Sequence, residues 1–323
     1  MERQFQIAAR GSSVRTEVLA GCTSFLTMAY IVLVNPAILS GAGMPIASVA
    51  AATCLAAAFG SILMGLMANV PLALAPGMGL NAYFAFTVVQ QMGLPWPVAL
   101  GCVFLSGVAF LILTLTGIRQ LIIAAIPPHL FAAIAGGIGL FLGFIGLKEA
   151  GIIVANPATL VSLGQLTAPG PALALFGLVV IAVLGLWNVR AAILIGITLT
   201  TLVAAAAGQI SAPTQPYRLD AITGTVLQLD IAGALGRGGA PGLALLEIIC
   251  VFLFVDLFDN VGTLVAVTKR AGLMDSAGRI AGLNRILRAD AIAAMAGALF
   301  GTSTVTSYVE SAAGVQAGGR TGL

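Results

Sequence analysis

The chain is a succession of apolar segments, each close to the roughly 20 residues that an α-helix needs to cross the hydrocarbon core of a bilayer. We identify ten of them, at about residues 17–39, 48–69, 71–91, 96–118, 130–147, 171–188, 191–208, 242–267, 285–300 and 302–318. Only 8% of the 323 residues are charged, whereas about a quarter are charged in a soluble domain. The sequence therefore predicts an all-α polytopic membrane protein.

Lys and Arg residues are distributed unevenly between the connections of these segments. With the N-terminus inside, eleven of the fourteen fall on the cytoplasmic side, and only Lys148, Arg218 and Arg237 fall on the other. Cytoplasmic connections of membrane proteins carry such an excess of positive charge. The N-terminus is polar and basic, and it lacks the pattern of a cleavable signal peptide. We expect a multi-pass protein of the cell membrane (inner or plasma) with a cytoplasmic N-terminus.

The third and tenth segments have a composition unlike that of a continuous helix. The third crowds Pro71, Pro76, Gly77 and Gly79 into its first half, and the tenth opens with the β-branched, hydroxyl-rich run GTSTVTSY. Each is expected to form a short extended piece at mid-membrane, followed by a half-helix. Non-helical backbone survives at that depth only where protein or a cavity satisfies it. Two such breaks, seven spans apart, indicate an inverted-repeat transporter with its binding site between them.

Three of the carboxylates within apolar segments are the strongest candidates for function, because an ionisable group at that depth costs several kcal/mol unless it faces a partner or a cavity. Asp256 and Asp259 are three residues apart in the eighth segment, on one helical face that Asn260 and Thr263 continue. The third acid is Glu310 in the tenth segment. A carboxyl group that exchanges its proton near neutral pH is what a proton-coupled carrier needs. The alternative is that the polar face bonds neighbouring helices as a structural element.

Two residues are predicted to begin the half-helices. Ser307 and Glu310 have the spacing of a capping box, in which Ser caps the helix and Glu reaches back to its first amides. Asn81 follows the Pro-Gly run and is expected to be the N-cap of the half-helix in the third segment. Its amide both donates and accepts, which suits a heterocycle that presents both kinds of edge.

These motifs resemble those of the AzgA-like purine permeases, the hypoxanthine/guanine/adenine branch of the nucleobase–cation symporter superfamily. The resemblance covers about residues 15–323 and rests on FLTMAYIVLVNPAILSGAGMP, NVPLALAPGMGLNAYFAFTVV, FLFVDLFDNVGTL and GTSTVTSYVESAAGVQAGGRTGL. It implies fourteen spans in two inverted seven-span repeats. A core domain of spans one to four and eight to eleven moves against a gate domain of spans five to seven and twelve to fourteen.

On this resemblance the chain carries about ten of the fourteen spans. Residues 1–118 are expected to form the first half of the core domain, 119–208 the first half of the gate domain, 209–241 an extracytoplasmic loop, and 242–323 core spans eight to ten, with the remainder missing. The resemblance places Asn81, Asp256, Glu310 and Gly79 at the substrate, and Asp256, Asp259 and Glu310 in proton coupling.

The expected function is a permease and not an enzyme, importing a purine nucleobase by proton symport. The expected partners are that small molecule and the lipid bilayer, with a homodimer left open, and no nucleic acid, metal or cofactor is expected besides the coupling proton. An anion transporter of the same fold is one alternative, although no Lys or Arg lies in the middle of a predicted span, and Arg285 and Arg288 lie at the start of the ninth. An intramembrane aspartyl protease is another, but its two aspartates lie on separate helices, whereas Asp256 and Asp259 share one.

Overall fold

Helices account for most of the computed structural model, which describes residues 2–118, 128–157, 159–187, 189, 192–210, 219–237, 242–274, 280 and 282–323. In chain order its elements are α1 (Glu2–Phe5), α2 (Val14–Met28), α3 (Ile31–Ser40), α4 (Ile46–Ala68), β1 (Leu74–Pro76), α5 (Met78–Ala82), the π-helical η1 (Tyr83–Gln91), α6 (Trp96–Leu115), α8 (Pro128–Glu149), β2 (Ile153–Asn156), β3 (Leu160–Leu163), α9 (Pro169–Leu186), α10 (Ala192–Ala206), η2 (Leu219–Gly224), η3 (Gly233–Arg237), α11 (Gly242–Arg270), α12 (Leu283–Phe300), β4 (Val305–Ser307) and α13 (Ser311–Gln316).

The ten predicted segments all coincide with these elements. Eight are helical over most of their described length, with a break at Ala29 and Tyr30 that separates α2 from α3. Among the described helices, four stretches are long and apolar enough to cross a membrane, namely Val14–Ser40, Ile46–Ala68, Trp96–Leu115 and Pro169–Leu186. The prediction of an all-α membrane architecture is confirmed.

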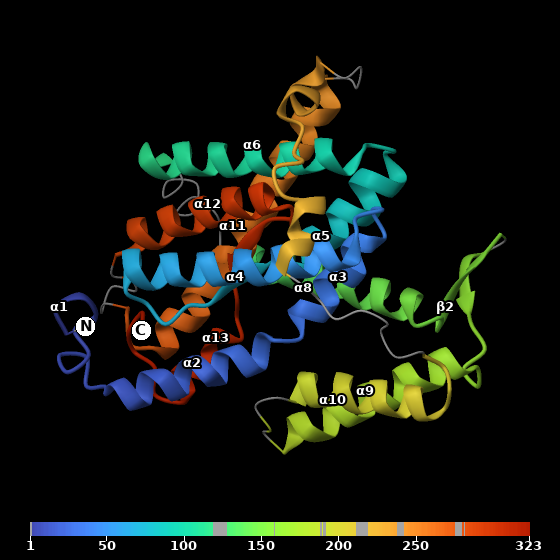
Figure 1. Ribbon diagram of the computed structural model, residues 1–323, viewed down its shortest axis with the longest axis horizontal. Coiled ribbons are helices and arrows are strands. Elements are labelled where there is room, and N and C mark those ends of the chain that lie inside the picture. The colour runs from blue at the N-terminus through green and yellow to red at the C-terminus, as the bar shows by residue number, and fades with distance from the viewer. Residues whose placement is uncertain are drawn as a thin grey trace.

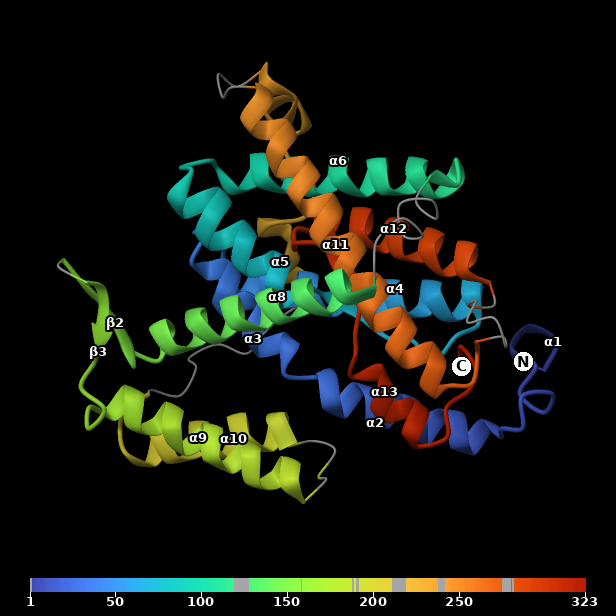
Figure 2. The same cartoon turned by 180° about the vertical axis from the view of Figure 1, so that it is seen from behind.

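The helices divide into a large packed group and a smaller pair. In the large group α12 packs between α4 and α6, and α11 crosses behind these three helices (Figure 1). Helix α2 packs with α13 on the side of the group away from α6. The pair α9 and α10 packs together beside α2, and the hairpin of β2 and β3 projects near it (Figure 2). The division of the chain into core and gate regions stays a prediction.

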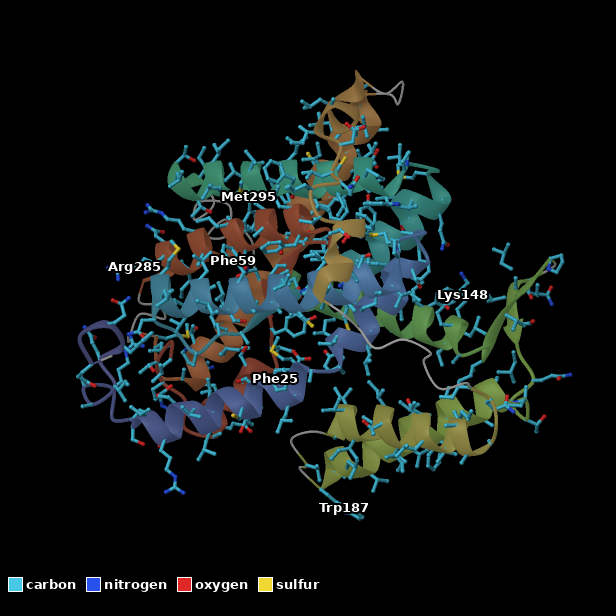
Figure 3. The ribbon with its side chains drawn as sticks, in the orientation of Figure 1. Phe25, Phe59, Lys148, Trp187, Arg285 and Met295 are labelled. Carbon is cyan, nitrogen blue, oxygen red and sulfur yellow. The ribbon has the colours of Figure 1, made fainter. Side chains whose placement is uncertain are left out.

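The outer surface suits lipid better than water. Leu178, Leu186 and Trp187 of the α9 region are 60%, 80% and 73% exposed, and the side chain of Trp187 extends away from the molecule (Figure 3). Contiguous exposed apolar surface of this kind is stable against hydrocarbon. Figure 3 also shows Arg285 on the left of the molecule and Lys148 on the right, and the distribution of charge in the sequence predicts opposite sides of the membrane for these two residues.

The two predicted breaks meet as a pair of short strands. β1 pairs with β4 in antiparallel register, with Leu74 opposite Ser307 and Pro76 opposite Val305. The pairing continues past the strands, because Gly77 N donates to Thr304 O at 2.9 Å and Tyr308 N donates to Ala73 O at 3.0 Å. All six strand residues are buried. Each break thus supplies hydrogen-bond partners to the other, which confirms the predicted extended pieces.

Small residues let two helices approach the strand pair closely. A Cβ on Gly60 of α4 would lie 3.1 Å from Leu74 Cβ, and one on Gly297 of α12 would lie 2.6 Å from Val305 Cγ2. Membrane helices commonly use glycine where a backbone must come this near. The strands therefore lie close against α4 and α12, and they also contact α3 and α11.

The segment predicted as an extracytoplasmic loop contains the short helical pieces η2 and η3 and packs onto the core. Leu227 N donates to Leu299 O at 2.8 Å, and Asp230 N donates to Pro97 O at 2.8 Å. Gly301 ends α12 with a φ of 87°, and a Cβ there would collide with Thr225. Only glycine satisfies both conditions at this position. The described part of the segment therefore covers the ends of α6 and α12.

Substituting Gly314 with alanine is expected to destabilise the contact between α13 and α2. The added Cβ would meet Ser24 Oγ and lie 2.8 Å from Ala20 O, and overpacking of this kind costs about 1–3 kcal/mol. Thermal unfolding of the detergent-purified protein measures the effect. Gly21→Ala is the matched control, because a Cβ at Gly21 on α2 has nothing within 4 Å. Equal unfolding temperatures for the two variants would contradict the close approach.

Candidate functional site

A small cavity of about 120 Å³ opens where the two breaks face α11. Its walls come from the start of α5, one face of α11 and the chain between β4 and α13. The lining residues are Gly77, Met78, Gly79, Leu80, Val255, Asp259, Thr263, Thr306, Ser307, Tyr308, Val309 and Glu310. The site therefore lies between the third and tenth segments and faces the eighth, as the sequence predicts.

Only part of the polar face predicted on α11 lines the cavity. Val255, Asp259 and Thr263, which are four residues apart, line the cavity. Asp256 and Asn260 are 3% and 0% exposed and are absent from its lining. In a helix of 3.6 residues per turn, the side chains of residues three apart point in directions that differ by about 60°. Two acids can therefore share one face of the helix while only one of them reaches the cavity. Asp259 is the acid that does so.

Glu310 reaches the cavity, but the predicted capping box is wrong. Ser307 is a strand residue paired with Leu74, so α13 begins later, at Ser311, with Glu310 itself in the N-cap position and without a side-chain cap hydrogen bond. One carboxylate oxygen of Glu310 instead accepts a hydrogen bond from Tyr30 Oη at 2.6 Å. Ser307, which the capping box assigns to the start of the helix, is instead part of the strand pairing.

The prediction that Asn81 caps a half-helix is also wrong. Gly77 occupies the N-cap of α5, and Asn81 lies inside the helix, with its N–H bonded to Gly77 O at 2.9 Å. Its side chain is completely buried and donates to Asn35 Oδ1. Asn81 thus belongs to the layer behind the cavity, whereas Gly79, two residues earlier, lines the cavity itself.

Asn35 is the centre of a buried hydrogen-bonded network behind the site. It accepts from Asn81 and donates to Thr53 Oγ1 at 2.7 Å and to Thr302 Oγ1 at 2.9 Å. The four side chains come from α3, α4, α5 and the residues just before β4, and each has an exposed fraction of zero. Buried hydrogen-bonded networks fix the relative positions of the elements that carry them, although Asn81 Oδ1 has no partner among the described residues. This one ties the two breaks to the first two spans.

The cavity offers acceptors and hydroxyl groups to a ligand. Two of its walls carry carboxylates, Asp259 and Glu310. Among the described residues, neither Thr306 Oγ1 nor Ser307 Oγ has a hydrogen-bond partner, although both are buried. Buried polar groups are nearly always bonded to protein or to water. The lining includes no Lys, Arg or His within the described ranges. The arrangement suits a neutral or protonated ligand with N–H donors better than an anion.

Sequence reasoning missed Tyr30, Asn35 and the hydroxyl wall of the cavity. An Asn in an apolar span is a signal that was available for Asn35. Tyr30 gave none, because an aromatic residue in a membrane helix is usually a packing residue. Tyr83 and Phe252 have that ordinary role, since their rings pack edge-on at a centroid distance of 5.3 Å and neither ring lines the cavity.

A larger cavity of about 460 Å³ lies between α2, α4 and the C-terminal residues. Its walls are mostly apolar, and they include Phe25 of α2 (Figure 3). The one carboxylate among its lining residues, Glu17, already accepts hydrogen bonds from Arg320 N at 2.9 Å and Thr321 N at 3.2 Å. Size alone does not make this the functional site, because it lacks the convergent polar groups of the smaller cavity.

Solved structures of low sequence identity share the fold. The transmembrane domain of the cyanobacterial bicarbonate transporter BicA superposes with a TM-score of 0.67 at 15% identity, over 96% of this chain and 78% of that one. The structure of SLC26A9 superposes with a TM-score of 0.59 at 12% identity, over 97% of this chain and 52% of that one. These likenesses show that the chain shares the fold of these two proteins.

Sequence relatives are much closer. Adenine permease AdeP of Escherichia coli K12 is 48% identical over 323 residues, which is all of this chain and 71% of the relative. Guanine/hypoxanthine permease PbuO of Bacillus subtilis 168 is 43% identical over 321 residues, or 99% of this chain and 74% of the relative. The model described as the permease family (Xan_ur_permease) matches residues 15–322. The chain is therefore a member of this permease family, a multi-pass membrane protein of the transporter class.

Proposed function

We propose that the protein is a purine nucleobase permease, which imports hypoxanthine, guanine or adenine by alternating access and couples this import to protons. The observation that carries the proposal is the pair of carboxylates, Asp259 and Glu310, on the walls of one small cavity between two interrupted spans. Relatives at 43–48% identity named adenine or guanine/hypoxanthine permeases support a purine as the substrate.

The cavity suggests a role for each candidate residue. Asp259 and Glu310 accept hydrogen bonds from purine N–H groups, while Gly79 leaves room for the ring and the hydroxyls of Thr306 and Ser307 bond its other polar atoms. Asp256 and Asn81 act from the buried layer behind the cavity and hold α11 and α5 in place. We assign proton coupling to the three acids Asp256, Asp259 and Glu310. A change in their protonation biases the equilibrium between inward-facing and outward-facing states.

The topology and assembly belong to the same proposal. The N-terminus faces the cytoplasm of a cell membrane, as the distribution of Lys and Arg favours. The resemblance to purine permeases leaves a homodimer open as the assembly. Light scattering on the purified protein measures the mass of the assembly and so the number of chains in it.

The alternative functions have less support. An anion carrier would place its substrate beside two carboxylates, with no basic side chain among the described lining residues. A protease with two catalytic aspartates needs them on facing helices, whereas Asp256 and Asp259 both lie on α11 and only Asp259 lines the cavity.

Uptake of labelled purine tests the proposed function. The protein is expressed in cells that lack their own purine carriers, and uptake of labelled hypoxanthine and adenine is measured against excess adenine, guanine, xanthine or uracil. We expect saturable uptake that purines inhibit and uracil does not, and that an uncoupler abolishes. Uptake no greater than in control cells would contradict a purine permease. Uptake that resists the uncoupler would contradict proton coupling.

A further inference from the structure

Tyr30 connects the first span to the acid of the tenth. It lies at the break between α2 and α3 and is 3% exposed. Its hydroxyl donates to Glu310 Oε1 at 2.6 Å. A hydrogen bond to a carboxylate at this distance belongs to the strong, charge-assisted class.

The Glu310 carboxylate therefore has a protein partner on one side and the cavity on the other. On one side it is bonded to Tyr30, and on the other it forms part of the cavity wall. A carboxylate has two oxygens that accept hydrogen bonds independently. With one oxygen engaged by Tyr30, the other is available to a ligand in the cavity.

We propose that Tyr30 is a positioning residue for substrate recognition, holding the Glu310 carboxylate so that its second oxygen faces the purine. This inference rests on the proposed function. A free glutamate side chain has several rotatable bonds, and ordering it upon binding reduces affinity. The hydrogen bond from Tyr30 orders the carboxylate before the ligand arrives.

The surroundings of Tyr30 make it a fixed point. Its neighbours Met28 and Ile31 are buried in one cluster with Ala75 of β1 and Tyr308. The first span is also held to the tenth by the close approach of Gly314 to Ser24. The phenol is thus anchored on elements that form the site, so its hydroxyl reaches Glu310 from a defined direction.

A purely structural role for Tyr30 would give different results. A buried phenol needs a hydrogen-bond partner, and Glu310 could serve only as that partner. In that case, loss of the hydroxyl would change folding stability and leave purine affinity intact. The two roles separate when binding and stability are measured on the same variants.

The experiment compares Tyr30→Phe with wild type and with Tyr83→Phe in binding of labelled adenine and hypoxanthine to the purified protein. Tyr83 is a matched control, because it is a partly buried tyrosine outside the cavity lining. Without the hydrogen bond from Tyr30 the Glu310 side chain must be ordered when the ligand binds, which is expected to raise Kd about 2- to 10-fold, and Tyr83→Phe is expected to leave Kd unchanged. In a Glu310→Ala background, Tyr30→Phe is expected to have no further effect. An unchanged Kd, or a loss of equal size in both backgrounds, overturns the inference.

Infrared spectroscopy gives a second measurement that needs no bound ligand. The carboxylate band that disappears in Glu310→Ala belongs to Glu310, and we expect Tyr30→Phe to shift it and Tyr83→Phe to leave it in place. A band that stays in place in Tyr30→Phe overturns the inference. Failure of the wild type to bind any purine would instead refute the proposed function, while the band shift would still report the link between Tyr30 and Glu310.

Discussion

Substituting Asp259 with asparagine is expected to weaken purine binding about 10- to 100-fold, because a hydrogen bond to a charged group contributes about 1.5–3 kcal/mol. Asp259 is the acid of α11 that lines the cavity, opposite the wall that carries Glu310. Asparagine keeps the size of the side chain but has a single acceptor oxygen and carries no charge. Equilibrium binding of labelled adenine or hypoxanthine to the purified variant measures the effect, and proton-driven uptake is expected to disappear with it.

The control for this substitution lies on the same helix. Glu247 is an exposed carboxylate of α11 outside the cavity lining, so Glu247→Gln removes a negative charge from α11 without changing the site. It is expected to bind purine as the wild type does. Wild-type affinity in Asp259→Asn, or an equal loss in Glu247→Gln, would contradict the assignment of Asp259 to the substrate.

Substituting Asn35 with leucine is expected to lower the free energy of unfolding by about 2–4 kcal/mol. Asn35 makes three hydrogen bonds, to Asn81, Thr53 and Thr302. Leucine has a similar size but makes none of these bonds, so the three partner groups remain buried and lose their hydrogen bond to residue 35. Each bond of this kind within a membrane protein contributes about 1 kcal/mol, and a buried group left unsatisfied costs about 1–3 kcal/mol. Thermal unfolding in detergent measures the loss. Purine uptake should fall as well, because the network holds both breaks in register.

Ser40→Ala provides the comparison on the same helix. Ser40 is half-buried, and its hydroxyl donates only to Ala37 O within its own helix, at 2.7 Å, so its removal should change the unfolding temperature little. If Asn35→Leu and Ser40→Ala were equally stable, the network behind the cavity would have no structural role.

Much of this architecture can be predicted from the sequence, because the bilayer imposes simple requirements. The length of the apolar runs predicts the spans, and Pro76, Gly77 and the run of Thr and Ser at 302–307 predict two breaks. Their pairing as strands was not predicted, but it has a simple physical reason, since extended backbone inside a membrane needs hydrogen-bond partners and each break supplies them to the other. The positions of Gly79, Asp259 and Glu310 at the cavity agree with this picture.

The details that depend on packing could not be predicted. The capping motif at Ser307 was overruled because the residue pairs with Leu74, which delays the start of α13 to Ser311. The choice between Asp256 and Asp259 depends on the rotation of α11 about its axis, and the residues around that helix decide it. Tyr30 reaches Glu310 across 280 positions of the chain, and no local pattern in the sequence connects them.

Photoaffinity labelling with an azido-purine tests the central claim, that the purine binds between the two breaks. After irradiation of the purified protein, mass spectrometry identifies the labelled residues with and without excess adenine or hypoxanthine. We predict that the label falls on residues of the small cavity, such as Met78, Val255 and Tyr308, and that the unlabelled purine displaces it. Displaceable labelling of the larger cavity instead, at Phe25 or Cys54, would contradict the account.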